Sequence, residues 1–142
     1  MFHLESIPVT DLIISAMEAR RKSYAPYSGY KAGAALLTGD SKIYTGCSIE
    51  NAAFFSGIYA EKCAISKAVS EGERNFKAIA VVGGSEGEKI TQYAYPCGDC
   101  RQFMREFVKP KDFFIIVAKD EKDYQIFTLE QLLPESSYQD IR

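Results

Sequence analysis

Histidine is nearly absent from this sequence of 142 residues, whose single imidazole is that of His3. A metal site in this chain would therefore have almost no nitrogen ligand to draw on. Positive charge is not in excess either, because 17 Lys and Arg stand against 19 Asp and Glu, giving a net charge of −2. Nucleic-acid binders usually carry a basic face and a high pI, so we expect no nucleic-acid partner.

Long apolar runs are also missing. No stretch approaches the roughly 20 apolar residues that a membrane-spanning helix needs, and residues 1–10 lack the basic start and apolar core of a signal peptide. We therefore expect a cytoplasmic protein with no membrane partner. In a reducing compartment, the four cysteines are expected to be thiols or metal ligands rather than disulfides.

The remaining composition is that of a folded globular protein, with 46% hydrophobic and 25% charged residues. A chain of this length buries about two-thirds of its unfolded surface and needs no disulfide or structural metal to fold. The sequence contains no repeat, linker or low-complexity segment. We therefore expect a single domain over residues 1–142.

Hydrophobic periodicity divides the chain into helices and strands. Helices are expected over residues 11–22, 59–70 and 96–107, with a helical turn over 129–133, and strands over 31–37, 42–49, 76–82, 113–118 and 124–128. This order predicts an α/β fold in which a mixed five-stranded sheet lies between helices, in three α/β/α layers.

One motif with metal-binding chemistry is Pro96-Cys97-Gly98-Asp99-Cys100, at the expected start of a helix. Two sulfur atoms at this spacing share one side of the first turn, where exposed N–H groups and the helix dipole stabilise thiolates. Thiolates bind zinc at about 2.3 Å. By itself the motif fits a catalytic zinc site, a redox dithiol and half of a structural zinc site.

A second motif, Tyr59-Ala60-Glu61-Lys62-Cys63, begins another expected helix. An isolated glutamate in a first turn is explained by the helix dipole alone. Followed by P-C-x-x-C further along the chain, Glu61 is similar to the glutamate of the zinc deaminase signature, which moves protons and does not bind the metal. The two motifs together favour a hydrolytic zinc site over a redox dithiol.

Most of the chain resembles the small homotetrameric cytidine deaminases and the related blasticidin S deaminases. The resemblance rests on five phrases in the family's order and spacing: SYAPYS (23–28), GAALL (33–37), GCSIENAAF (46–54), AVSEG (68–72) and PCGDCRQ (96–102). It implies a cytidine deaminase-like fold, a Zn²⁺ cofactor and a homotetramer or homodimer. The implied reaction is hydrolytic deamination of cytidine or deoxycytidine to uridine or deoxyuridine plus ammonia.

The resemblance also implies roles for individual residues. Glu61 matches the catalytic glutamate, and Cys97 and Cys100 match two zinc ligands. The implied substrate-binding residues are Tyr30, Ser48, Glu50, Ala60 and Tyr138. Tyr30 stands where the family usually has phenylalanine, and Ser48 stands in place of an asparagine that contacts the ribose. Glu50 matches a residue that binds the ribose, Ala60 matches one at the base, and Tyr138 lies near an aromatic that a neighbouring subunit contributes. Because serine is shorter than asparagine, another nucleoside or a blasticidin-like antibiotic is also a credible substrate.

Position 59 departs from the family pattern, because Tyr59 stands where the third zinc-binding cysteine is expected. Lys62 likewise replaces an arginine that donates hydrogen bonds to the thiolates. In one interpretation the Tyr59 phenol or a water completes the zinc shell with Cys97 and Cys100, and two thiolates then balance the charge of Zn²⁺ without a guanidinium. In a second, Cys63 is the replacement ligand. In a third, zinc is lost and the protein only binds nucleosides.

Overall fold

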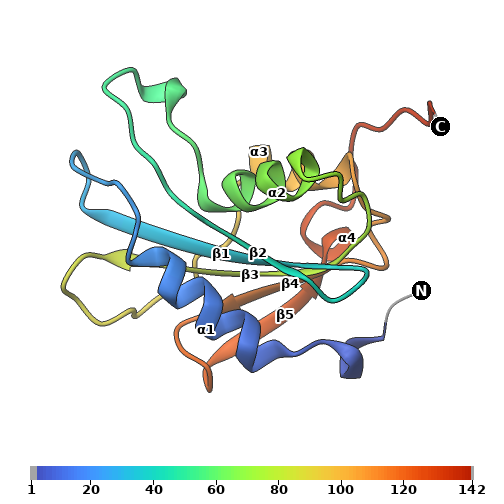
Figure 1. Ribbon diagram of the computed structural model, residues 1–142, viewed down its shortest axis with the longest axis horizontal. Coiled ribbons are helices and arrows are strands. Elements are labelled where there is room, and N and C mark those ends of the chain that lie inside the picture. The colour runs from blue at the N-terminus through green and yellow to red at the C-terminus, as the bar shows by residue number, and fades with distance from the viewer. Residues whose placement is uncertain (1–2, 142) are drawn as a thin grey trace.

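A computed structural model describes residues 3–141 as one mixed five-stranded sheet flanked by helices (Figure 1). The helical elements are η1 (Leu4–Ser6), α1 (Val9–Arg20), η2 (Phe54–Ser56), α2 (Ala60–Ser70), α3 (Gly98–Arg105) and α4 (Leu129–Leu132), and the strands are β1 (Tyr30–Thr38), β2 (Ile43–Cys47), β3 (Phe76–Ser85), β4 (Phe114–Ala118) and β5 (Tyr124–Thr128). The predicted α/β fold with a mixed five-stranded sheet is confirmed.

The strands lie in the order β2-β1-β3-β4-β5. Strands β3 and β4 are parallel, and the other neighbouring pairs are antiparallel. A parallel pair needs a crossover connection, which is usually a helix, and here α3 lies in the chain between β3 and β4. The C-x-x-C motif therefore lies at the start of the helix in this crossover connection.

Strand β1 is buried on both faces of the sheet. Because successive side chains point to opposite faces, Ala35 and Leu37 pack with the residues of α1, whereas Ala34 and Leu36 pack with those of α2 and α3. Helix α1 therefore covers one face and α2 and α3 cover the other, which gives the three predicted layers (Figure 1). None of the helices within residues 3–141 is long and apolar enough to cross a lipid bilayer.

Several element boundaries differ from the prediction. Helix α1 begins at Val9 rather than at residue 11. Helix α2 begins one residue late because Tyr59 is its N-cap, with φ −77° and ψ 154°. Helix α3 begins at Gly98 rather than at Pro96, since Cys97 has extended backbone at φ −70° and ψ 170°. Two of the three predicted metal ligands, Tyr59 and Cys97, are therefore N-caps.

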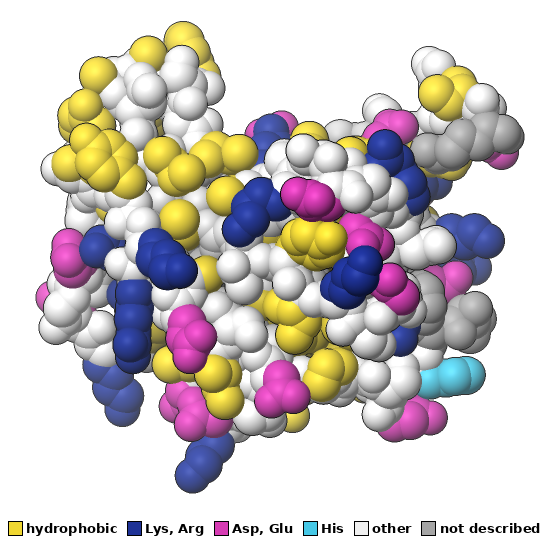
Figure 2. Space-filling model, in the orientation of Figure 1, with side chains coloured by type: hydrophobic (Ala, Val, Ile, Leu, Met, Phe, Trp, Pro, Cys, Tyr) yellow, Lys and Arg dark blue, Asp and Glu magenta, His cyan; other side chains and the backbone are white. Residues whose placement is uncertain are grey.

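The loop between β2 and α2 projects from the body of the molecule (Figure 1). It contains η2, in which Phe54 and Phe55 are 89% and 93% exposed. Figure 2 shows hydrophobic side chains over this projecting loop. This loop therefore exposes two large apolar side chains to solvent.

Candidate active site

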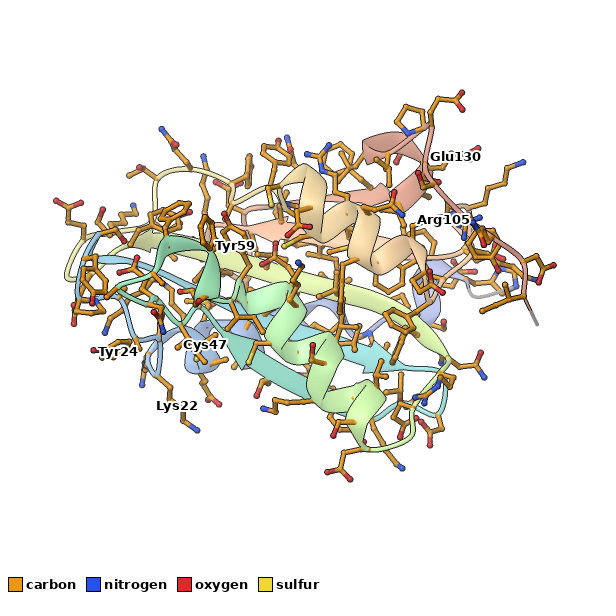
Figure 3. All side chains as sticks on the ribbon, turned by 90° about the horizontal axis from the view of Figure 1, so that it is seen from above. Lys22, Tyr24, Cys47, Tyr59, Arg105 and Glu130 are labelled. Atoms are coloured by element: carbon orange, nitrogen blue, oxygen red, sulfur yellow. The ribbon has the colours of Figure 1, made fainter. Side chains whose placement is uncertain are left out.

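The N-terminal ends of α2 and α3 form the candidate site. The two helices pack side by side on the same face of the sheet, and Figure 3 shows Tyr59 at the N-terminal end of α2. The first turn of α2 contains Glu61, and that of α3 contains Cys100. The predicted convergence of the two motifs is therefore present in the structure.

Glu61 is a buried carboxyl, 5% exposed. Burial raises the pKa of this carboxyl, although the hydrogen bonds it accepts from its own backbone N–H and from the Cys100 thiol act in the opposite direction. A carboxyl whose pKa is raised toward neutrality can both accept and donate a proton within one catalytic cycle. The structure thus gives Glu61 the contact and the environment that proton transfer needs.

The two cysteines of the motif lie in contact but differ in exposure. Cys97 is exposed at the N-cap, whereas Cys100 is buried in the first turn. Burial strongly raises the pKa of the Cys100 thiol, and negative charge on Glu61 and Cys97 raises it further. A bound cation reverses this preference, because a coordinating thiol is deprotonated outright. The donor chemistry of this cluster therefore fits a divalent metal ion.

The Tyr59 phenol lies within electrostatic reach of the two cysteines. The pKa of its phenol is raised, first by negative charge on Cys97, then by burial and by Cys100. Within residues 3–141, no three His, Cys, Asp or Glu side chains are placed to hold a metal ion together. The third position of a zinc shell at this site is therefore left to a donor of another type, such as the Tyr59 phenol or a water.

Cys63 does not join this pair of sulfurs. Burial raises the pKa of the Cys47 thiol on β2, and the neighbouring Cys63 raises it further. A side chain built at Gly46 of β2 would lie 2.8 Å from the Cβ of Cys63. Cys63 thus faces β2, and the structure does not support its replacing the missing cysteine ligand.

Lys62 and Asp99 connect the two helix ends. The Lys62 ammonium lies 2.6 Å from a carboxylate oxygen of Asp99, the residue between the two cysteines. It also lies 5.2 Å from the ring centroid of Phe103. No role for Asp99 is predicted from the sequence, because its position in α3 does not reveal a partner in α2. The lysine thus pairs with a carboxylate instead of donating two hydrogen bonds in the manner of arginine.

Tyr30 and Ala60, two of the residues predicted to bind the substrate, lie close to Glu61. Burial raises the pKa of the Tyr30 phenol, and the negative charge of Glu61 raises it further. A Cβ on Gly83 would lie 2.6 Å from the Tyr30 hydroxyl, so the ring end rests against the backbone of β3. Ala60 is fully buried at the first position of α2.

Ser48 is engaged within the protein. Its hydroxyl lies 2.5 Å from the Ser23 hydroxyl and accepts a hydrogen bond of 3.1 Å from the Ala32 backbone N–H. These contacts tie the end of β2 to β1 and to the loop after α1. A hydrogen bond from Ser48 to the sugar would therefore have to compete with its hydrogen bonds to Ser23 and Ala32.

Glu50 is held by the loop after α1. Its carboxylate accepts hydrogen bonds from the Tyr27 and Ser28 N–H groups at 2.9 and 3.2 Å, and from the Ser28 hydroxyl at 2.5 Å. The Ser28 hydroxyl and these N–H groups lower the pKa of Glu50. An ionised, oriented and partly exposed carboxylate is suited to accepting hydrogen bonds from sugar hydroxyls, which is the role predicted from the sequence.

Tyr138 lies away from Glu61 within the chain. The Arg105 guanidinium sits 3.7 Å from the centre of its ring, and Figure 3 shows Arg105 far from Tyr59, at the other end of α3. Tyr138 lines a cavity of about 770 Å³ together with Arg74 and Phe107. The role expected for Tyr138 is in the pocket of a neighbouring subunit, and it stays a prediction.

Comparison with known proteins agrees with this geometry. Residues 2–94 match the family model of the cytidine and deoxycytidylate deaminase zinc-binding region. The cytidine deaminase of Sporosarcina psychrophila is 42% identical over 126 residues, covering 89% of this chain and 88% of that protein. That of Halalkalibacterium halodurans is 41% identical over 123 residues, covering 87% and 89%.

Solved structures give the same result. The crystal structure of cytidine deaminase from Burkholderia pseudomallei superposes with a TM-score of 0.80 at 40% identity, covering 89% of this chain and 97% of that one. The Mycobacterium leprae cytidine deaminase structure gives a TM-score of 0.74 at 32% identity, covering 91% and 99%. The family predicted from the sequence is confirmed: this chain belongs to the cytidine deaminase family.

Proposed function

We propose that this protein catalyses the zinc-dependent hydrolytic deamination of cytidine or deoxycytidine, producing uridine or deoxyuridine and ammonia. The observation that carries the proposal is the buried Glu61 carboxyl in hydrogen-bond contact with Cys100, at the meeting point of two helix N-termini. The names of the similar proteins, which are cytidine deaminases, support the reaction and the substrate class.

Tyr59, Cys97 and Cys100 would hold the zinc ion through one phenol oxygen and two sulfurs. Catalytic zinc sites have three protein ligands and keep a fourth position for water, and such an ion supplies the acidity that lowers the pKa of water to about 7. Two thiolates balance the charge of Zn²⁺. This balance explains why Lys62 can pair with Asp99 instead of the sulfurs.

Glu61 moves the protons of the reaction. Its carboxylate accepts a proton from the attacking water and delivers it to the ring nitrogen next to the carbon that bears the amine. It then transfers the second water proton to the amine, which leaves as ammonia when the carbon–nitrogen bond breaks. Because burial raises its pKa, the carboxyl can hold each proton between these transfers.

Three further residues would bind the nucleoside. Tyr30 and the small Ala60 border Glu61 and are suited to the base. The oriented carboxylate of Glu50 is suited to the sugar hydroxyls. Ser48 is engaged with Ser23 and would add little to sugar binding, so a blasticidin-like nucleoside remains a second candidate substrate.

We also propose that the chain works as a homotetramer or homodimer that buries Phe54 and Phe55. Each of these side chains is about nine-tenths exposed on the projecting loop, and burying apolar surface is the main driving force of association. Light scattering during size-exclusion chromatography should give a multiple of 15.9 kDa for the wild type. The double variant Phe54→Ser/Phe55→Ser should be smaller, and an unchanged mass would exclude this surface.

The proposed cellular location is the cytoplasm, with a small nucleoside as the partner rather than a nucleic acid. Cys47, Cys63, Cys97 and Cys100 are all free thiols, as expected in a reducing compartment. The net charge of −2 gives no electrostatic affinity for a phosphate backbone.

The experiment that tests the proposed function combines zinc analysis of the purified protein with a substrate panel. Ammonia release is measured with cytidine, deoxycytidine and blasticidin S. We expect bound zinc and release from cytidine or deoxycytidine. Release from blasticidin S alone would transfer the proposal to that substrate class, and nucleoside binding without any ammonia release would mean a protein that only binds.

A further inference from the structure

Arg101 connects the cysteine motif to the C-terminal part of the chain. Its Nε donates a hydrogen bond of 2.7 Å to the carbonyl of Pro96, the residue before Cys97. One of its terminal nitrogens donates a hydrogen bond of 2.6 Å to the carbonyl of Leu132. Its backbone N–H also donates to the Cys97 carbonyl at 3.0 Å. One side chain thus bridges the residue before Cys97 and the end of α4.

Helix α4, to which Arg101 binds, is held in place by a capping box and by a buried leucine. Thr128 and Gln131 form a capping box at its start, and Leu129 is fully buried. Leu132 is its last residue, and carbonyls in a last helical turn have no partner within the helix. A cation is favoured at such an end by the helix dipole. Arg101 therefore satisfies a carbonyl of α4 while it holds the loop before α3.

The two sulfurs of the motif depend on this loop to different degrees. Cys100 is buried within α3 and keeps its place with the helix. Cys97 is exposed and lies at the N-cap on extended backbone, so the backbone of Pro96 and Cys97 sets the position of its sulfur. Metal ligands have to meet their ideal distances within about 0.2 Å. Small movements of this backbone would therefore weaken metal binding.

We propose that Arg101 is a positioning residue that fixes Cys97 relative to Cys100 by clamping the Pro96 carbonyl to the end of α4. This inference rests on the proposed function insofar as the cysteine pair binds zinc. The planar guanidinium donates to two carbonyls in a fixed geometry, which the flexible ammonium of lysine does not reproduce. Replacement by lysine keeps the charge and removes the clamp.

Arg105 offers a matched control on the same helix, one turn further on. It donates to the Ser136 hydroxyl at 3.2 Å and to the Val108 carbonyl at 3.0 Å, and it stacks on Tyr138. Arg105 thus binds the C-terminal segment with similar contacts, and Val108, Ser136 and Tyr138 lie outside the cysteine loop. Replacing either arginine could weaken α3 in general. Only replacing Arg101 should also shift Cys97.

The test compares Arg101→Lys and Arg105→Lys with the wild type. Zinc affinity is measured by competition with a chromophoric chelator, and thermal unfolding of the metal-free proteins is followed in parallel. Changing a residue that orients a metal ligand costs about 10- to 100-fold in metal affinity, and we expect this loss for Arg101→Lys. Arg105→Lys should stay within about twofold of the wild type on the same measure. Equal affinities in all three proteins, or equal losses in both variants, would overturn the proposal.

A second measurement does not depend on zinc. Alkylation of the metal-free proteins is followed peptide by peptide in a mass spectrometer. Loss of the clamp should change the alkylation rate of Cys97, whose position depends on this loop, in Arg101→Lys but not in Arg105→Lys, whereas Cys100, buried within α3, should react as slowly as in the wild type. If no protein binds zinc, the proposed function fails and the alkylation pattern still decides the role of Arg101. If Arg101→Lys does not fold, Arg101→Gln takes its place, and failure of both variants to fold would contradict a local role.

Discussion

Gly46→Ala should displace the helix that carries Glu61. A Cβ at Gly46 of β2 would lie 2.4 Å from the backbone nitrogen of Ala64 and 2.6 Å from the carbonyl oxygen of Ala60. Ordinary contacts of a Cβ begin at about 3.4 Å, so α2 has to retreat from the sheet by about 1 Å. Ala60 is the first residue of α2 and precedes Glu61, which places the displacement at the catalytic carboxyl.

The expected cost of Gly46→Ala has two parts. Inserting a methyl group into a packed interior destabilises a protein by about 1–3 kcal/mol. A misplacement of about 1 Å at a catalytic group can reduce the rate by about 100-fold. Urea unfolding of the metal-free protein and the initial rate of ammonia release from cytidine measure the two effects separately.

Gly98→Ala is the matched control for this prediction. A Cβ at Gly98, the first residue of α3, meets nothing within 4 Å. Alanine is favoured over glycine in helices by up to about 1 kcal/mol, so stability should be unchanged or slightly higher. If Gly46→Ala has the stability and rate of the wild type, the close approach of α2 to β2 does not position Glu61, and the reasoning is refuted.

Three further changes test other parts of the site. Tyr59→Cys should tighten zinc binding by at least about tenfold, because thiolates are softer and better zinc ligands than phenols, and unchanged affinity would mean that position 59 points away from the ion. Asp99→Asn should cost at most about 1 kcal/mol in urea unfolding, because its carboxylate is 65% exposed and exposed ion pairs contribute little; a loss of several kcal/mol would contradict this. Hydrogen bonds from Ser28 and Tyr27 lower the pKa of Glu50 below 4.5, so its contribution to stability is present above pH 4.5 and is lost as the pH falls through the folded-state pKa. Glu50→Gln should therefore show less acid destabilisation than the wild type, and parallel pH profiles of stability would contradict the assignment.

Local sequence pattern predicts most of the elements because helices and strands have different hydrophobic periods. It fails at element ends, where neighbouring segments decide. Because Gly83 and Gly84 have low strand propensity, the strand that begins at Phe76 was predicted to end at Val82. In the structure, β3 continues to Ser85 because it pairs with the first residues of β1. Similarly, the extended backbone of Cys97 moved the start of α3 past Pro96.

The same difference between local sequence pattern and tertiary contacts applies to the candidate site. Glu61 and the C-x-x-C pair were predictable because each motif contains its chemistry within a few residues at a helix start. The ion pair of Lys62 and Asp99 was not predictable, because it joins residues of two helices that are distant in the chain. The position of Tyr138 on Arg105 likewise depends on how the C-terminal segment folds back over α3. Contacts of this kind need the tertiary structure.

The central claim is that Glu61 transfers protons beside a zinc ion held at the two helix ends. The most direct test is ammonia release from cytidine by zinc-loaded wild type and Glu61→Gln in parallel, with the zinc content of both samples determined. We expect equal zinc contents and a rate that is about 10²- to 10⁴-fold lower in the variant, since glutamine cannot carry the proton. Equal turnover by the two zinc-loaded proteins would contradict the claim.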